Sequence, residues 1–446
     1  MIDIKLLRSN KKIFYDSCKA RGFDLKYLDE FFVLDDRWRS NLKKINEIKH
    51  DKNTITMEIS KNIKKGNDVE QLKNNVVQLN KKIEELSTDQ NEIETERDKI
   101  IRLIPNLLYR DVPVCKGDEN NKLVRYSGTA RVFREDMGYF RENSGNSENY
   151  EILENRPLSH VDLMNDLDLV DLDRASKIAG SRFYFIKNRL FKLELALTTY
   201  AVDFLSQRNF SIVEPPFMIN YASMAGATDI ETFKDTLYKI EGDDLYLIAT
   251  AEHPIASMLS GEIMNEDELP LRIGGVSSCF RKEAGAHGKD TKGIFRVHQF
   301  NKIEQFIFCK PDLSWDYFDE LVKNSEDIYK SLEIPYRVVN VCSGELGNLA
   351  AKKYDSEAWY PSQGKFREIV SASNDTDYQA RSLNIKYRAG SKNEFVHTLN
   401  STAIATTRIL VAIMENYQRE GYIEIPKVLI PYTGFDRIEK EGNNGT

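Results

Sequence analysis

A heptad repeat between residues 69 and 101 constrains the fold of this chain more than any other feature. The repeat has the 4-3 spacing of a coiled coil and lasts about four heptads. Its apolar positions are Leu72, Val76, Leu79, Ile83, Leu86, Ile93 and Ile100, and its gaps fall at Gln90 and Arg97. The pattern predicts a long helix that packs along a second helix.

The preceding segment supplies that second helix. Apolar residues recur at a looser helical spacing from Leu28 to Ile63, and residues 64–68 (KKGND) interrupt the pattern. Two long helices that meet at a tight turn form an antiparallel hairpin. A helix of about 33 residues rises about 50 Å, so the hairpin would project as an arm. We expect this coiled-coil arm over about residues 27–101, within an amino-terminal domain of residues 1–110.

The outer half of the expected arm is basic. Residues 37–82 hold twelve Lys and Arg against five Asp and Glu, whereas residues 84–98 are acidic. Such an arm could be a coiled-coil spacer or dimerisation element with solvated lysines, or it could bind a nucleic acid backbone in a salt-sensitive way. The candidate nucleic acid contacts are Lys43, Lys44, Lys49, Lys52, Lys61, Lys64, Lys65 and Lys73.

Composition bounds the remaining possibilities. The chain has 446 residues and is 41% hydrophobic, which suits two or three globular domains. No stretch approaches 18 uncharged apolar residues, and the amino terminus lacks an apolar signal core, so we expect neither a membrane span nor export. The five cysteines are far apart and form no CxxC pair, which suggests neither a disulfide framework nor a cysteine zinc site. A cytoplasmic protein is expected.

The segment from Phe280 to Phe300 has the composition of a phosphate-binding hairpin. Its 21 residues include seven basic or His side chains, three glycines and two acidic residues. We expect Arg281 and Glu283 on one strand, a flexible connection at 285–293, and a second strand at 294–300. Guanidinium groups suit phosphate, and Phe300 offers a face for a purine. Without further support, a solvated surface loop is an equal alternative.

Elsewhere the chain reads as a linker followed by a globular domain. Residues 111–156 are polar and turn-rich and form the expected linker, and residues 157–446 form the expected catalytic domain. Residues 192–207 predict an amphipathic helix. The following apolar segment holds Pro215 and Pro216, which restrict it to a sheet edge or an interface.

Three segments, in this order, resemble the motifs of class II aminoacyl-tRNA synthetases. The helix at 192–207 with Pro216-Phe217-Met218 resembles motif 1, residues 280–300 resemble motif 2, and a helix at 402–417 with a single arginine, Arg408, resembles motif 3. The strings TAEHP (250–254), GAHGKDTKGIFRVHQFNKIEQF (285–306), YDSEAWYPSQGKFREIVSASN (354–374) and HTLNSTAIATTR (397–408) are similar to the seryl-tRNA synthetase family. The resemblance covers nearly the whole chain. It implies an α+β fold, in which an amino-terminal coiled-coil hairpin is followed by a catalytic domain with an antiparallel sheet flanked by helices.

The resemblance also implies an ATP site. Arg281 would bind the α-phosphate and the amino acid carboxylate, Glu283 the adenine amino group, and Arg408 the far end of a bent ATP. Phe300 would stack on adenine, and Val297 would line the base pocket through its backbone. Glu368 and Ser371 would hold Mg²⁺, which prefers oxygen ligands. Lys282, Ile369 and Val370 are the remaining residues of the implied ATP-binding site. No zinc is expected.

Serine recognition is implied at a second group of residues. Thr250, Ala251, Glu252, Arg281, Glu304 and Thr402 would form a small pocket for one hydroxyl group. The residues alone do not separate serine from threonine or glycine. Many family members read Asn-Gly-Ser where this chain has Asn400-Ser401-Thr402, and the added methyl group bears on that discrimination.

The implied reaction joins L-serine to ATP as seryl-adenylate and transfers the seryl group to the 3′ end of serine tRNA, releasing AMP and diphosphate. The family also serylates selenocysteine tRNA where that tRNA exists. The implied partners are a second subunit, joined through motif 1, and the long variable arm of serine tRNA, read by shape. Two alternatives are a catalytically silent RNA-binding paralogue and a carrier-protein amino acid ligase, although the basic hairpin argues against the ligase.

Overall fold

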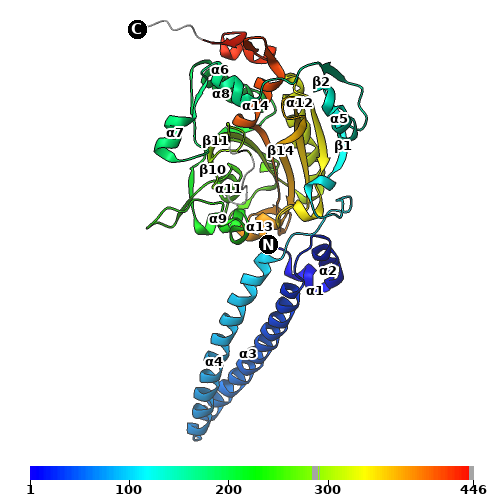
Figure 1. Ribbon diagram of the computed structural model, residues 1–446. Helices are drawn as coiled ribbons and strands as arrows, with labels where there is room; N and C mark the ends of the chain where they lie inside the picture. Colours follow the sequence, from blue (N-terminus) through cyan, green and yellow to red (C-terminus); the bar gives the residue numbers. More distant parts are fainter. Residues whose placement is uncertain (284–289, 291, 441–446) are drawn as a thin grey trace. The chain divides into compact units, whose positions relative to one another are not determined.

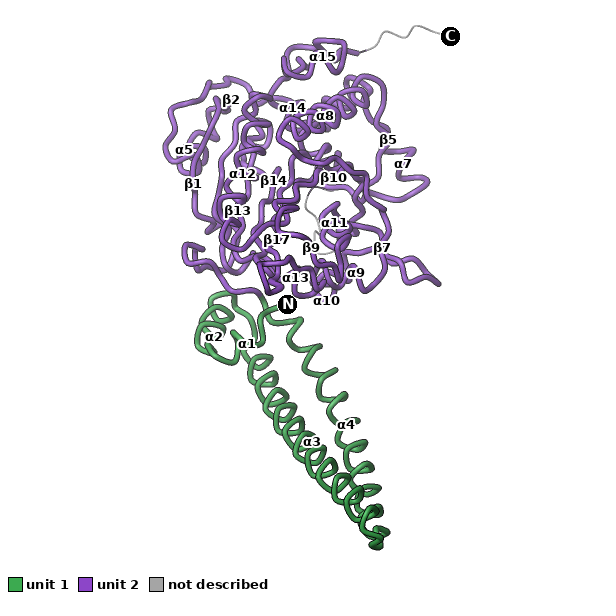
Figure 2. The backbone as a smooth tube through the Cα atoms, turned by 180° about the vertical axis from the view of Figure 1, so that it is seen from behind, with its two compact units in different colours: residues 1–105 green, residues 106–446 purple. Residues whose placement is uncertain are grey.

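The chain consists of two compact units. The computed structural model describes residues 1–283, 290 and 292–440. The units are Met1–Pro105 and Asn106–Thr446 (Figure 2). This division differs from the linker expected at 111–156, because residues 122–127 form strand β1 of the main sheet of the second unit. The polar composition of this stretch is that of an exposed sheet edge. No helix among the described residues is both long and apolar enough to cross a membrane.

The first unit is the helical hairpin that the heptad repeat predicts (Figure 1). Its helices are α1 (Ile4–Ser9), α2 (Lys11–Ala20), α3 (Lys26–Lys64) and α4 (Glu70–Leu103). Helices α3 and α4 pack against each other. The turn between them contains Gly66 with a φ of 73°, a conformation that glycine adopts without a steric penalty. The predicted hairpin and its turn are confirmed.

A buried charge cluster explains one gap in the heptad repeat. The Arg97 side chain is buried, and its guanidinium group lies 3.7 Å from Asp35 and over the Trp38 ring. Asp35 is 1% exposed and also accepts a hydrogen bond of 2.8 Å from Arg8. Arg97 therefore occupies a seam position as the counter-charge of a carboxylate on the facing helix.

The second unit is built on an eight-stranded sheet. All neighbouring strands are antiparallel except β6 and β10, which are parallel. The order across the sheet is β1 (Lys122–Ser127), β12 (Tyr336–Asn340), β13 (Lys352–Tyr360), β14 (Lys365–Thr376), β17 (His397–Ala405), β11 (Gln299–Cys309), β10 (Leu271–Phe280) and β6 (Ser211–Val213). The edge position of β6 agrees with the two prolines that follow it.

Three helices cover one face of this sheet. They are α8 (Asn188–Ser206), α12 (Ser314–Ser331) and α14 (Thr406–Tyr417), and their apolar side chains join those of the strands in one core. On β11, Asn301 hydrogen-bonds Glu194 of α8 and Gln305 hydrogen-bonds Ser325 of α12. Because side chains alternate along a strand, Phe300, Lys302 and Glu304 point to the opposite face.

Shorter elements surround the sheet. The helices are α5 (Met137–Asn143), α6 (His160–Asp166), α7 (Leu172–Ala179), α9 (Tyr221–Ala227), α10 (Ile230–Phe233), α11 (Glu252–Ser257), α13 (Tyr378–Leu383) and α15 (Ile430–Thr433). The strands are β2 (Ala130–Phe133), β3 (Tyr150–Leu153), β4 (Val170–Asp171), β5 (Phe185–Ile186), β7 (Met218–Asn220), β8 (Leu245–Leu247), β9 (Ile263–Met264), β15 (Lys386–Ala389), β16 (Lys392–Phe395), β18 (Gln418–Arg419), β19 (Tyr422–Glu424) and β20 (Arg437–Glu439).

Several predicted element boundaries are wrong. Strand β10 ends at Phe280, so Arg281 and Glu283 do not share a strand, and Glu283 has a φ of 51°. Strand β11 begins at Gln299 rather than at 294, and helix α14 begins at Thr406 because residues 402–405 extend β17. The connection predicted at 285–293 falls largely outside the described residues.

The cysteine prediction is also wrong. Cys115 and Cys342 form a disulfide, although 227 positions separate them. The fold brings their Cα atoms within 5.3 Å, and the Gly344 N–H donates a hydrogen bond of 3.1 Å to the Cys115 carbonyl. Sequence spacing could not reveal this pair, because it depends on the path of the chain beside β12 and β13. Cys18, Cys279 and Cys309 are buried and unbridged.

Replacing Asp35 with alanine should destabilise the helical hairpin. The change removes the carboxylate that Arg8 and Arg97 share and leaves the buried Arg97 with only the more exposed Glu94 and Asp98 as counter-charges, which costs about 2 kcal/mol. Urea unfolding followed by the helical circular dichroism signal measures the loss. The matched control is Asp36→Ala, which removes an exposed partner of Arg39 and should change the free energy of unfolding by less than about 0.5 kcal/mol. Equal effects of the two substitutions would contradict the assignment.

Candidate active site

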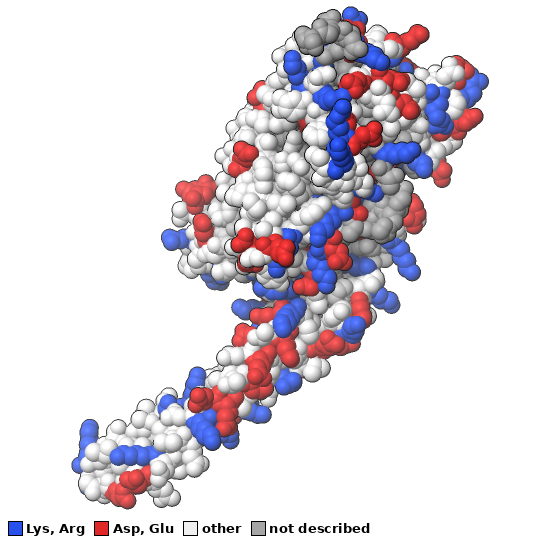
Figure 3. All heavy atoms as spheres, turned by 60° about the vertical axis from the view of Figure 1, so that its left-hand side comes forward, with Lys and Arg blue, Asp and Glu red and all other residues white. Residues whose placement is uncertain are grey.

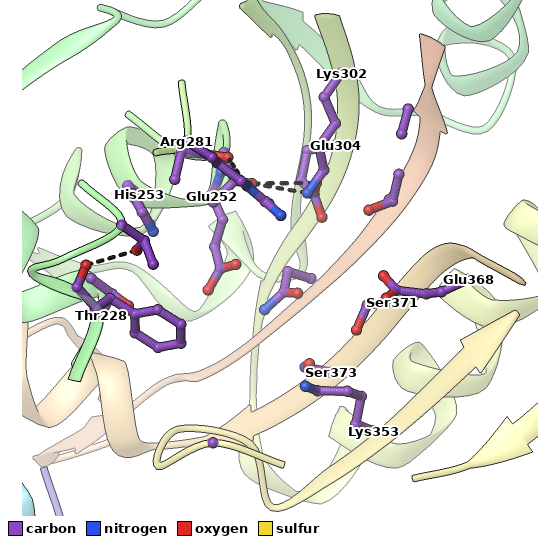
Figure 4. A pocket seen from close by; sticks show the side chains of 18 of the residues that line it. Thr228, Glu252, His253, Arg281, Lys302, Glu304, Lys353, Glu368, Ser371 and Ser373 are labelled. Atoms are coloured by element: carbon purple, nitrogen blue, oxygen red, sulfur yellow. Dashed lines mark hydrogen bonds and ion pairs between the residues drawn. The ribbon is translucent and has the colours of Figure 1, made fainter. Parts of the chain in front are cut away.

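A cavity of about 680 Å³ lies on the open face of the large sheet. Its lining combines side chains from β11, β14 and β17 with Arg281, which follows β10, and with the segment from Gly344 to Ala350 (Figure 4). Twelve of the sequence-predicted residues line it: Thr250, Glu252, Arg281, Glu283, Val297, Phe300, Glu304, Glu368, Ile369, Ser371, Thr402 and Arg408. Ala251, Lys282 and Val370 lie outside the lining, and Val370 packs into the core.

A buried ion pair occupies one end of the cavity. The Lys302 ammonium group contacts the Glu304 carboxylate and donates a hydrogen bond of 3.1 Å to the Thr250 hydroxyl. Lys302 is 8% exposed and Glu304 is 1% exposed. Burial raises the pKa of Glu304, and Lys302 opposes that shift. Thr402 of β17 lies opposite Glu304 in the sheet register. These groups form a small polar pocket.

A second carboxylate, Glu252, stands beside this pair. The hydrogen-bond donor to Glu252 is a neutral side chain, the amide of Gln379. This amide donates a hydrogen bond of 2.8 Å to the Glu252 carboxylate and another of 2.9 Å to the Ala227 carbonyl. Burial first, and then the charge of Glu304, raises the pKa of Glu252 to about 7. The positive charge of Lys302 opposes this rise in the pKa of Glu252, and Lys302 and Arg281 both oppose the rise in the pKa of Glu304. The pocket suits a small cationic or zwitterionic ligand with a hydrogen-bonding group.

The middle of the cavity is basic. The Arg281 Nε donates to the Ala249 carbonyl at 3.1 Å, and the guanidinium group lies over the Phe300 ring. Arg296 pairs with Glu283 at 3.1 Å. Figure 4 shows Arg281 beside Glu252, Lys302 and Glu304. Such forked cations match the geometry of carboxylate and phosphate groups.

A bulge in β14 places two oxygen ligands on one face. Glu368 pairs with Glu357 and Val370 with Ser356, so Ile369 is an extra residue. The bulge shifts the alternation, and as a result both Glu368 and Ser371 line the cavity. Arg408 of α14 lies 3.0 Å from the Glu368 carboxylate. Burial opposes ionisation of Glu368, but Arg408 and Lys353 lower its pKa.

Glu368 and Ser371 fit a hard divalent cation. Asp355 lies opposite Ser371 in the register, and its Oδ1 has no hydrogen-bond partner among the described residues. Burial and the charge of Glu368 raise the pKa of Asp355 to about 7. A bound cation would stabilise both carboxylates, and the Asp355 Oδ1 is an oxygen atom still free to interact with it. Within 1–283, 290 and 292–440, no group of three or more His, Cys, Asp and Glu side chains could hold a metal ion alone. A ligand would have to complete the coordination.

Sequence reasoning missed several residues of the site. Lys302 carries a signal that could have been used, because it lies two residues before Glu304 on a strand and must share its face. Gln379 and Asp355 come from distant segments and carry no such signal. His253 lies in the lining, and burial lowers its pKa to about 3, so it is a neutral imidazole.

Comparison with known proteins agrees with this geometry. The model of the seryl-tRNA synthetase N-terminal domain matches residues 1–108. The model of the class II tRNA synthetase core domain (G, H, P, S and T) matches residues 233–417. The chain is 73% identical over 445 residues to the serine-tRNA ligase of Picrophilus torridus, covering 99% of this chain and 100% of that protein.

Solved structures extend the likeness to three dimensions. The seryl-tRNA synthetase of Pyrococcus horikoshii, complexed with ATP, has a TM-score of 0.96 at 48% identity and covers 99% of this chain and 100% of its own. The cytoplasmic serine-tRNA ligase of Naegleria fowleri, in complex with AMP, has a TM-score of 0.86 at 39% identity, with 99% of each chain covered. Since both family models and full-length relatives match, the chain belongs to the seryl-tRNA synthetase family of class II synthetases.

Proposed function

We propose that the protein activates L-serine with ATP to seryl-adenylate and transfers the seryl group to the 3′ end of serine tRNA, releasing AMP and diphosphate. One observation carries the proposal: a single cavity joins a buried acidic pocket to a row of arginines, in a chain that matches this family along nearly its whole length. Selenocysteine tRNA is a further acceptor where that tRNA exists. We place this activity in the cytoplasm, where charged tRNA supplies translation.

The first step forms a bond between a serine carboxylate oxygen and the α-phosphorus, and diphosphate leaves. Arg281 is placed to neutralise charge on both reacting groups, because its positive charge lowers the pKa of both Glu304 in the acidic pocket and Glu368. Holding the two anions together supplies much of the rate enhancement through orientation alone. In the second step a hydroxyl of the terminal tRNA ribose attacks the seryl carbonyl carbon, and AMP leaves.

The nucleotide contacts follow from the same arrangement. Phe300 offers its ring to adenine, Glu283 accepts from the adenine amino group, and Arg408 binds the terminal phosphate. Val297 lines the base pocket, with Lys282, Ile369 and Val370 beside the nucleotide through their backbone. Arg281 and Arg296 now contact Phe300 and Glu283, so ATP would replace these contacts.

Mg²⁺ is the proposed cofactor. Glu368 and Ser371 would hold it, and bridging phosphate oxygens would complete its shell. The ion supplies charge neutralisation on the phosphates. Arg408 keeps the Glu368 carboxylate ionised and in place, which the metal requires of its ligand.

Serine specificity is proposed at the acidic pocket. Glu304 and Thr402 face each other across neighbouring strands and bracket a space for one hydroxyl group. Thr250 and Glu252 close the pocket at the start of α11, with the buried Ala251 between them in the sequence, and Arg281 takes the substrate carboxylate. A site built to hydrogen-bond a hydroxyl rejects an analogue without one, because its buried polar groups are then left unpaired.

The arm is the proposed tRNA-binding element. Figure 3 shows Lys and Arg side chains near the tip of the helical hairpin and acidic side chains nearer its base. Of the eight candidate lysines, all but the half-buried Lys52 are exposed. Exposed cations on a long helical hairpin can bind the phosphate backbone of an RNA duplex by shape and charge. The long variable arm of serine tRNA is the duplex that we propose they bind.

A homodimer is proposed through the motif 1 helix. Phe191 and Leu195 lie one turn apart on α8 and are 44% and 51% exposed. Their side chains add to the apolar surface of Ile178 and Phe185 on the preceding elements. Large apolar side chains in such positions mark an interaction surface.

Pyrophosphate exchange tests the proposed reaction. With ATP and Mg²⁺, serine should stimulate exchange far more than threonine, alanine or glycine. Glu304→Ala should reduce serine-stimulated exchange by about 100-fold, since the pocket loses its hydroxyl acceptor. Glu148→Ala, at an exposed glutamate outside the cavity, should leave it unchanged. A folded protein that exchanges with none of the four amino acids would instead be a silent RNA-binding paralogue.

The salt dependence of tRNA binding tests the arm. Replacing Lys64 and Lys65 with alanine should lower the slope of log K against log salt by about 1.4 to 1.8, because each lost phosphate contact removes about 0.7 to 0.9. The matched control is Lys12→Ala with Lys19→Ala, which removes equal charge from α2. Equal losses in the two double variants would show that the effect is net charge rather than an arm contact.

The oligomeric state tests the motif 1 interface. Leu195→Glu should convert a dimer into a monomer in light-scattering chromatography, because the carboxylate would be buried without a partner. Asp243→Lys, at an exposed position in the turn before β8, should remain dimeric. A wild-type protein that is monomeric at micromolar concentration would overturn the proposal.

A further inference from the structure

Lys302 stands out among the cavity residues because no role in the proposed reaction accounts for it. It lies on β11 between Phe300 and Glu304, on the face that lines the cavity. Lysine is almost never fully buried unless it is paired. Burying the Lys302 ammonium group costs free energy of folding. A role in the function of the site would account for that cost.

The contacts of Lys302 are confined to the acidic pocket. Its ammonium group pairs with the Glu304 carboxylate and donates to the Thr250 hydroxyl, and the Thr250 hydroxyl in turn lies 3.5 Å from the Glu304 carboxylate. The three groups form a closed triangle. In Figure 4 the Lys302 and Glu304 side chains lie together on one strand, with Arg281 beside them.

The two carboxylates of the pocket are compensated differently. Glu252 is held by the neutral amide of Gln379, whereas Glu304 contacts a cation directly. Two buried carboxylates close together tend to share a proton, since like charges disfavour ionisation of both. The ammonium group of Lys302 contacts Glu304 directly and so favours the ionised form of that carboxylate.

We propose that Lys302 is a positioning residue for serine recognition, whose ammonium group holds Glu304 as an ionised carboxylate aimed at the substrate hydroxyl and fixes the Thr250 hydroxyl beside it. The inference rests on the proposed function, because it assigns the serine hydroxyl to Glu304. An ionised carboxylate only accepts hydrogen bonds, and a protonated one also donates. The charge of Glu304 therefore determines whether the pocket demands a hydroxyl donor.

Other ionisable groups also surround Glu304. They are Glu252 and His253 of α11, Arg281 beyond β10, Cys279 of β10 and Tyr329 of α12. Burial keeps His253 neutral, and it raises the pKa of both Cys279 and Tyr329, so these three carry no charge near neutral pH. Arg281 is committed to the substrate carboxylate in the proposed reaction. Lys302 is thus the cation available to Glu304 while serine is bound.

The test compares Lys302→Met with wild type in serine-dependent pyrophosphate exchange over a range of pH. Methionine keeps much of the side-chain length without the charge. The variant should show a KM for serine raised roughly 30-fold at neutral pH, because removing one partner of a buried charge pair has a large penalty. The KM for ATP should stay within about two-fold of wild type, since the contacts proposed for ATP lie elsewhere in the cavity.

The pH profile separates positioning from a merely structural role. Without Lys302 the pKa of Glu304 rises, so the carboxylate is protonated at low pH and becomes ionised as the pH rises. The KM for serine in the variant should therefore fall as the pH rises through the raised pKa of Glu304, while the wild-type value stays flat. Glu304→Gln, which is neutral at every pH, should have a raised KM without this recovery. Lys302→Arg should restore part of the affinity.

The outcomes are distinct. Wild-type protein without serine-dependent exchange would overturn both the proposed function and this inference. Wild-type exchange together with a pH-independent KM in Lys302→Met, or with equal increases in the KM for serine and for ATP, would overturn the inference alone. A KM that recovers with pH in Lys302→Met and not in Glu304→Gln is the result that supports it.

Discussion

The burial of charged groups on one face of a single sheet is the constraint on which the second unit depends. Each ionised group taken out of water needs a partner, because desolvation costs more than a single weak contact returns. The cavity meets this need with the pair of Lys302 and Glu304 along β11 and the pair of Arg408 on α14 with Glu368 on β14. The second pair joins two elements that must be packed together before the charges can pair. The site is therefore a consequence of the complete fold.

Two irregularities in the sheet make that pairing possible. A regular strand would place Glu368 and Ser371 on opposite faces, and the extra residue Ile369 brings them to the same face. On β17 the register also shifts by one residue, and Thr402 comes to lie opposite Glu304. Regular alternation supplies the apolar face that α8, α12 and α14 cover. The bulges supply the local exceptions that the chemistry requires.

The sequence predicts the repeating parts of the structure well and the exceptions poorly. The heptad repeat predicts α4 and the looser helical spacing before it predicts α3, because the packing of both helices depends on side chains three and four residues apart. The family resemblance implies the roles of Arg281, Glu304 and Arg408, and the fold brings them to one cavity. The contributions of Gln379 and Asp355, and the bridge between Cys115 and Cys342, depend on contacts across the fold. No local pattern encodes such contacts.

In the proposed function, the two units would bind phosphate in contrasting environments. The arm presents exposed lysines such as Lys64, which would bind tRNA through the release of counterions. The cavity uses arginines such as Arg408, which are largely shielded from solvent and already paired with carboxylates. Salt screens exposed charges far more than buried ones. Rising ionic strength should therefore weaken capture of tRNA well before it weakens adenylate formation, since the second depends in part on the buried charges of Lys302 and Glu304.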